Sequence, residues 1–237
     1  MTSSGLNFLT LVTFGRSGST ALQAAINAHP HVVLRGENYN AFVGLWRYWT
    51  AISEAANRHH SGKPENPWFG TAKLNPQEVL KDLRTNAIDY VFRPKKDTRW
   101  TGFKEVRYEQ AYFPNSAALV SYLLFLQELF PGLCFMLNTR NPERAARSGW
   151  WGGHPNATQV LTQTNTVLRN TAGVLTTMLG SKRVQLVDYD VWKEDPEIVF
   201  RALSAFDFPA SKKVVFESLS HKLIHGKIPE DGHQGHD

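Results

Sequence analysis

The sequence predicts a single α/β domain in which helices flank a parallel sheet. Short runs of β-branched and aromatic residues alternate with helical patterns along the chain, as in parallel sheets with helical crossovers. No linker or shift in composition divides the 237 residues, so one domain over 1–237 is expected. Hydrophobic residues make up 42% of the chain, which is enough for a sizeable core.

The first βαβ unit is expected within the N-terminal part of the chain. Residues 6–14 form a short apolar run that ends at a glycine, which predicts a buried strand. Residues 20–28 carry apolar side chains at helical spacing, and a second apolar run follows at 32–34. This order predicts two parallel strands joined by a helix.

The remaining elements continue the alternation. An aromatic helix is expected at 41–59, a loop rich in Gly, Pro, Asn and His at 60–76, and a flexible polar tail at 229–237. The other expected elements are strands at 100–103, 133–138 and 184–187 and helices at 116–130, 142–151 and 196–206. Asn or Asp followed by proline, a typical helix start, stands at 75–76, 141–142 and 195–196.

Charge and cysteine content narrow the class of protein. The net charge of +5 favours an anionic ligand, but the basic residues are too scattered to predict nucleic-acid binding. The lone Cys134 excludes an intramolecular disulfide. No signal peptide pattern and no apolar run of the roughly 18 residues needed to span a membrane is evident. We therefore expect a soluble cytoplasmic protein without a membrane partner, and the sequence leaves its oligomeric state open.

A candidate anion site follows the first strand. Residues 13–20 read Thr-Phe-Gly-Arg-Ser-Gly-Ser-Thr, at the position where a βαβ unit presents the N–H groups of a helix start. The hydroxyls of Ser17, Ser19 and Thr20 are further donors, and Arg16 supplies a positive charge. The alternative is a tight strand-to-helix turn with serine caps.

This loop is P-loop-like but departs from the ATP-binding motif. Only two residues separate Gly15 from Gly18, and no lysine follows the second glycine. The ATP-binding motif has four residues between its glycines and a Lys-Ser/Thr pair after them. The loop therefore suits an anion better than a triphosphate with magnesium.

The same residues resemble a known enzyme family. Phe14-Gly-Arg-Ser-Gly-Ser-Thr20, followed by His29-Pro30 and Gly36-Glu37, resembles the opening of the sulfotransferases that use 3′-phosphoadenosine 5′-phosphosulfate (PAPS). The pattern is closest to tyrosylprotein sulfotransferases and related bacterial enzymes, whose loop reads Pro-Arg-Ser-Gly-Thr-Thr. Cytosolic small-molecule sulfotransferases carry lysine at the arginine position. The resemblance extends to Lys227 and implies that residues 16–20, Gly18 included, hold the 5′-phosphosulfate.

A second anion motif follows the strand at 133–138. Arg140 leaves this strand and Ser148 follows eight residues later, about two turns along the expected helix. Both side chains can therefore converge on one phosphate. The alternative is that Arg140 caps the sheet edge while Glu143 and Arg147 form an i,i+4 pair. In the resembling family this arginine and serine hold the 3′-phosphate of PAPS, although Gly152 stands where tyrosylprotein sulfotransferases usually add another arginine.

Glu37 is the candidate general base. It lies at the carboxyl end of the second strand, where open parallel sheets bind ligands, and a carboxylate there can accept the proton of an acceptor hydroxyl. The alternative is a turn glutamate paired with Arg35 or Arg16. The resemblance aligns Glu37 with the catalytic base of tyrosylprotein sulfotransferases, whereas His29 precedes a proline and is expected to be structural.

Lys104 is the candidate that stabilises the leaving group. It follows the expected strand at 100–103, and in the resembling enzymes a lysine there approaches the oxygen that bridges phosphate and sulfate. The alternative is a surface pair between Lys104 and Glu105.

Three further positions are assigned by resemblance. Tyr189 matches a position that contacts the nucleotide, although a buried aromatic residue after a strand is an equal alternative. Lys222 and Lys227 lie in a segment that resembles the loop closing over the cofactor. The Arg-Lys-Gly of cytosolic members is missing there.

The sequence thus predicts transfer of a sulfuryl group from PAPS to a hydroxyl of a small molecule, with 3′-phosphoadenosine 5′-phosphate (PAP) as product. The cofactor-binding residues would be 16–20 with Arg140, Ser148, Tyr189, Lys222 and Lys227. Arg16, Glu37 and Lys104 would act in catalysis. No metal is expected, because no cluster has ligand spacing. A small-molecule kinase using the same loop and a non-catalytic nucleotide- or polyanion-binding module are the alternatives.

The acceptor is expected to bind near a long insertion. About 60 residues, 40–99, separate the Glu37 and Lys104 strands, and insertions of that length beside a cleft often carry specificity. Their aromatic content and lack of a dense basic patch predict a small acceptor with an apolar or ring-bearing body.

Overall fold

Five parallel strands form one sheet, in the order β2-β3-β1-β4-β5. The structure, a computed structural model, describes residues 5–58 and 62–220. The strands are β1 Asn7–Val12, β2 Val32–Arg35, β3 Trp100–Glu105, β4 Cys134–Thr139 and β5 Val184–Asp188. All four pairings are parallel, so the predicted fold class is confirmed.

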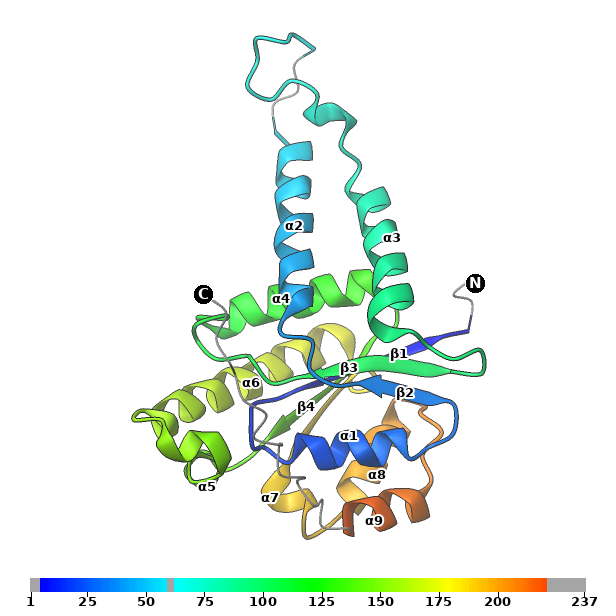
Figure 1. Cartoon of the computed structure of the whole chain (residues 1–237), viewed down its shortest axis with the longest axis vertical. Coiled ribbons are helices and arrows are strands. Elements are labelled where there is room, and N and C mark those ends of the chain that lie inside the picture. Colours follow the sequence, from blue (N-terminus) through cyan, green and yellow to red (C-terminus); the bar gives the residue numbers. More distant parts are fainter. Residues whose placement is uncertain (1–4, 59–61, 221–237) are drawn as a thin grey trace, which may run out of the picture.

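Both faces of the sheet are buried. Along β1, Phe8 and Val12 enter one hydrophobic cluster, whereas Leu9 and Leu11 enter a second cluster on the opposite face. Figure 1 shows α4 and α6 over one face and α1, α8 and α9 over the other. These helices are α1 Ser19–Asn27, α4 Ser116–Leu129, α6 Ala157–Leu179, α8 Glu197–Ala205 and α9 Lys212–Ser220. A sheet covered on both faces explains why its strands appear as nearly continuous apolar runs.

The insertion between β2 and β3 forms a projecting arm. Its elements are α2 Ala41–Ala56, the 3₁₀ turn η1 Thr71–Lys73, α3 Pro76–Asn86 and the π-helical turn η2 Ala87–Phe92. In Figure 1, α2 and α3 rise from the α4 side and carry their connection away from the sheet. Within the described ranges, no helix combines the length and apolar character that crossing a membrane requires.

Several local expectations are confirmed. The Asn75 side chain caps α3 by accepting from Gln77 and Glu78, and Asn141 accepts from the Arg144 N–H in α5, Pro142–Ala146. The Asp195 side chain accepts from the Glu197 N–H, although α8 begins at Glu197 with Pro196 at the capping position. His29 is buried, and its Nε2 accepts from the Ser211 N–H, which ties the start of α9 to the end of α1. The role of His29 is therefore structural.

The strand order creates a switch point at the carboxyl edge of β1. The chain leaves β1 through α1 toward β2 on one side of the sheet, whereas β4 lies on the other side. In register, Val12 stands beside Glu105 of β3 and Leu137 of β4. Segments that follow β1, β3 and β4 therefore meet at this edge, where open α/β sheets bind their ligands.

Candidate active site

The loop between β1 and α1 has the backbone of an anion cradle. Arg16 and Gly18 have left-handed conformations, with φ of 68° and 79°. In the described part of the chain, the backbone N–H groups of residues 15–20 donate to no backbone carbonyl. These donors lie at a helix start, where the peptide dipoles favour negative charge.

Asn138, near the end of β4, fixes this loop from beneath. Its amide nitrogen donates to the Ser17 carbonyl at 2.9 Å, and its amide oxygen accepts from the Trp192 indole at 2.9 Å. The hydroxyls of Thr13 and Ser17 lie 2.6 Å apart and are fully buried. The Ser17 hydroxyl is thus committed to the loop, and its backbone N–H remains for a ligand. Sequence reasoning did not single out Asn138.

The expected helix at 142–151 is wrong, and the break changes the position of Ser148. Helix α5 ends at Ala146, and Ser148 has extended backbone before the 3₁₀ segment η3, Gly149–Gly153. This break turns the Ser148 hydroxyl toward Arg16, whose Nε donates to it at 3.1 Å. Gly149 has φ of 60°, and a Cβ there would lie 2.8 Å from that Nε. A side chain at 149 would therefore displace Arg16.

Arg140 meets the loop from the end of β4. Its Nη1 donates to the Arg16 carbonyl at 2.6 Å, and its guanidinium lies 4.5 Å from the centre of the Tyr189 ring. The same ring packs on Gly18, where a Cβ would lie 2.1 Å from it. The Arg140 Nε is buried and has no hydrogen-bond partner. An unpaired buried donor of this kind is costly and suits a bound anion.

Glu37 lies between two cations. The Lys104 ammonium donates to Glu37 Oε1 at 2.9 Å, and Arg107 Nη1 donates to Glu37 Oε2 at 3.3 Å. The Lys104 side chain is only 7% exposed, so the surface pair considered for it is wrong. Arg35 bonds to carbonyls of the Phe92–Arg93 segment and does not pair with Glu37.

The Glu105 carboxylate holds the turn that carries Glu37. It is fully buried, and its Oε2 accepts from the N–H groups of Asn38 and Asn40 while Oε1 accepts from Val106 and Arg107. Burial disfavours the charge of Arg107, but Glu105 and Glu37 outweigh it and raise the pKa of this guanidinium. Arg107 therefore stays charged beside the candidate base.

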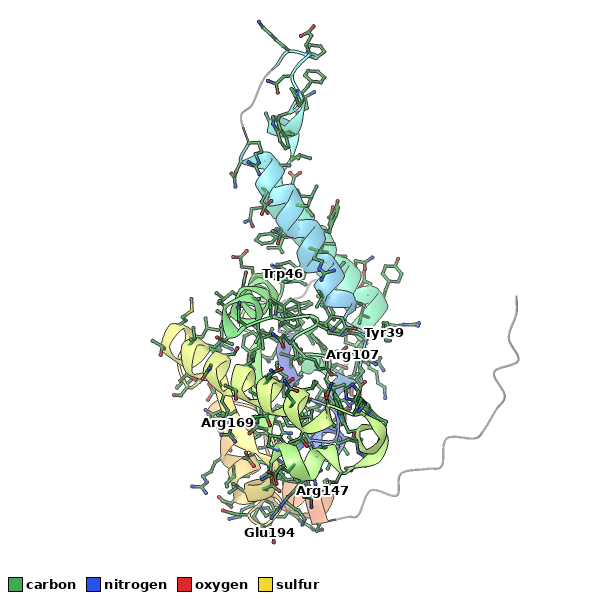
Figure 2. All side chains as sticks on the ribbon, turned by 90° about the vertical axis from the view of Figure 1, so that its left-hand side faces the viewer. Tyr39, Trp46, Arg107, Arg147, Arg169 and Glu194 are labelled. Carbon is green, nitrogen blue, oxygen red and sulfur yellow. The ribbon has the colours of Figure 1, made fainter. Side chains whose placement is uncertain are left out.

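The Tyr39 ring covers the outer side of Arg107. Its centre lies 4.6 Å from the guanidinium, and Figure 2 shows the two side chains together on one side of the molecule. Such a cation–π contact favours a fixed guanidinium orientation. Tyr39 is itself 79% exposed, so this stack stands at the surface.

One cavity of about 370 Å³ joins most of these groups. Its lining consists of Gly15, Arg16, Ser19, Thr20, Glu37, Lys104, Val106, Arg107, Glu109, Tyr112 and Trp150. The structure thus brings together the sequence-predicted Arg16, Ser19, Thr20, Glu37 and Lys104. Arg140, Ser148 and Tyr189 contact the same loop through Arg16 or Gly18. Lys222 and Lys227 lie outside the described residues.

Five side chains that line the cavity were not among the predicted site residues: Val106, Arg107, Glu109, Tyr112 and Trp150. Four of them follow β3, and their position after a strand at the switch point was the signal that could have found them.

The insertion contributes none of its described residues to this cavity. Trp46 and Trp49 pack against the core instead, and Figure 2 shows Trp46 at the foot of the arm. At the tip, Arg58 lies over Trp68. No described aromatic residue of the arm therefore lines the cavity beside the candidate base, although Tyr48, Phe69 and Tyr90 of the arm are exposed.

Burial raises the pKa of the Glu109 carboxyl, and its own backbone N–H and the charge of Arg107 act against that rise. Among the residues that the structure describes, no group of three or more His, Cys, Asp or Glu side chains is placed to hold a metal ion.

Comparison with known proteins gives a family and a fold. The profile of the family described as "Sulfotransferase family" matches residues 9–206. The structure is similar to the sulfotransferase domain of the olefin synthase of Synechococcus PCC 7002, with a TM-score of 0.56 at 16% identity over 92% of this chain and 79% of that chain. It is also similar to the sulfotransferase domain from the curacin biosynthetic pathway, with a TM-score of 0.52 at 13% identity over 94% and 81%. Curated protein sequences give no significant match.

Proposed function

Since the chain belongs to the sulfotransferase family, we propose that its donor is PAPS and that its acceptor is a hydroxyl of a small molecule. The family assignment makes the chain an enzyme of the sulfotransferase type. One observation supports the proposed donor and acceptor above all. Five predicted site residues line one cavity: Arg16, Ser19, Thr20, Glu37 and Lys104.

The fit to the two anionic ends of PAPS rests on unsatisfied donors. The loop N–H groups at 15–20 and the Arg16 side chain would hold the phosphosulfate. The buried, unpaired Nε of Arg140 and the Ser148 hydroxyl would hold the 3′-phosphate. Bound PAPS supplies a sulfuryl group on a leaving phosphate oxygen.

The chain's own residues would divide the remaining work. Glu37 would accept the proton of the acceptor hydroxyl while that oxygen bonds to sulfur and the bond from sulfur to the bridging oxygen breaks. Arg16 and Lys104 would stabilise the charge that develops on the bridging oxygen, and PAP would leave. Arg107 and Lys104 together keep Glu37 oriented.

The direct test is transfer of label from [³⁵S]PAPS to a panel of small phenols and alcohols. We expect PAPS-dependent labelling and stabilisation of the fold by PAP in a thermal shift experiment. Stabilisation by ATP with Mg²⁺ but not by PAP would favour the kinase instead. PAP binding without labelling of any acceptor would favour a non-catalytic binding module.

A further inference from the structure

Three polar or aromatic side chains of the cavity have no role in the proposed transfer. They are Glu109, Tyr112 and Trp150. Tyr112 is 37% exposed and Trp150 61% exposed, and Glu109 is half-buried. They come from the β3–α4 connection and from η3, beside the candidate base and the candidate anion loop. This position is where an acceptor would have to lie.

The Glu109 carboxyl lacks a partner side chain. Arg107 Nη1 donates to Glu37 and Glu105, and no side chain of the described residues donates a hydrogen bond to the Glu109 carboxyl. Burial already raises the pKa of this carboxyl. The carboxyl also lies on the cavity wall, so it can accept a further hydrogen bond from a ligand group that donates one.

The backbone of Tyr112 and the ring of Trp150 are held in place. The N–H groups of Tyr112 and Phe113 donate to the Glu109 carbonyl at 2.9 and 3.1 Å, so the same turn fixes Tyr112 relative to Glu109. The Trp150 ring stacks on Trp151 with centres 4.1 Å apart. Preformed aromatic walls with a few polar groups are typical of sites for apolar or planar ligands.

We infer that the acceptor binds with its body against Tyr112 and Trp150 and with a second hydrogen-bond donor, a hydroxyl or an amino group, on the Glu109 carboxyl. This inference rests on the proposed function and adds to it the chemistry at the far end of the acceptor. A carboxylate at that end would be disfavoured, because it would meet Glu109 with no donor to offer.

The test uses four acceptors that share a para-hydroxyphenyl group: 4-ethylphenol, tyrosol, tyramine and 4-hydroxyphenylacetate. They differ only in the remote group, which is apolar, hydroxyl, ammonium or carboxylate. For the unchanged enzyme we expect kcat/KM for tyrosol, tyramine or both to exceed that for the other two by about tenfold or more. The tyrosol and tyramine arms separate a hydroxyl from an amino donor.

Glu109→Gln should abolish this preference. We expect the ratio of kcat/KM between tyramine and 4-hydroxyphenylacetate to fall by about ten- to a hundredfold, while PAP affinity stays unchanged. Glu128→Gln is the matched control, since Glu128 is an exposed carboxylate of α4 outside the cavity. Tyr112→Ala should instead lower kcat/KM for all four acceptors alike.

An unchanged ratio in Glu109→Gln, with normal PAP binding and turnover, would overturn the inference and leave the proposed function standing. Absence of both PAP binding and label transfer in the unchanged enzyme would overturn the proposed function itself. If Glu109→Gln does not fold, Glu109→Asp tests the same contact. Binding of tyramine and 4-hydroxyphenylacetate to the PAP-loaded protein by calorimetry then gives a readout independent of turnover.

Discussion

At the scale of single residues, the proposed transfer depends on a carboxylate that is fixed and still able to accept a proton. Each Glu37 oxygen accepts one bond, from Lys104 or from Arg107, and each keeps a lone pair for an acceptor hydroxyl. Lys104 serves two groups in this scheme, because it orients Glu37 and would reach the leaving oxygen.

Glu37→Gln keeps the shape of the side chain and removes its basicity. PAP affinity should hold while turnover falls by roughly two to four orders of magnitude. Calorimetry with PAP and a labelled-PAPS assay measure the two effects separately. Turnover within a few-fold of the unchanged enzyme would show that Glu37 is not the base.

Arg140→Ala tests the 3′-phosphate site. Adenosine 5′-phosphosulfate lacks that phosphate, so the variant should weaken PAP far more than this ligand. A lost charge-assisted contact is worth roughly 1.5–3 kcal/mol, on the order of ten- to a hundredfold in affinity. Calorimetric titration of both ligands makes the comparison, and equal weakening would defeat the assignment.

At the scale of elements, the site depends on how strand ends and turns are joined. Glu105, at the end of β3, accepts four hydrogen bonds and ties down the turn that follows β2. Sequence reasoning found Lys104 and Glu37 from their positions after strands. It could not find their pairing, because that pairing requires β2 and β3 to be neighbours although the whole arm separates them in the chain.

Glu105→Gln should loosen this junction. An amide has only one accepting atom, so two of the four donors would lose their acceptor inside the protein. We expect a loss of roughly 1–3 kcal/mol in the free energy of unfolding, measured by urea titration. Turnover should fall with it, since the Glu37 turn would no longer be held. A variant as stable and as active as the parent would contradict this role.

Two tryptophans, one in the arm and one in η3, allow a matched comparison of the two candidate acceptor sites. Trp68, at the arm tip, and Trp150, in the cavity, are both partly exposed. Trp150→Ala should raise the KM of a ring-bearing acceptor by about tenfold, because an aromatic wall is lost. Trp68→Ala should leave it within a few-fold. Steady-state kinetics measure both KM values. A larger effect of Trp68→Ala than of Trp150→Ala would indicate that the acceptor binds at the insertion.

At the scale of the whole molecule, the fold could be predicted from the sequence because both faces of the sheet are buried. Apolar strands separated by helical patterns predict a parallel sheet, and the glycine loop after β1 marks its ligand edge. The direction of the arm could not be predicted, because it depends on packing of α2 and α3 against α4. The break at Ser148 was missed because an apolar Trp-Trp pair continues the helical pattern beyond it.

The charge of the cavity predicts how acceptors respond to salt. The lining has three cations, Arg16, Lys104 and Arg107, against the carboxylates of Glu37 and Glu109. It offers no continuous basic groove for a long anionic glycan. Turnover of a small neutral acceptor should therefore change only a few-fold between about 0.05 and 0.5 M salt. Efficient sulfation of sulfated polysaccharides that falls steeply with salt would contradict this expectation.

We propose that the loop after β1 and the side chains of Arg140 and Ser148 hold the two ends of one PAPS molecule. A co-crystal structure with PAP tests both sites at once. We expect the 5′-phosphate on the N–H groups of residues 16–20 and the 3′-phosphate within hydrogen-bond distance of Arg140 and Ser148. PAP bound away from this loop, or with its 3′-phosphate in contact with neither side chain, would contradict it.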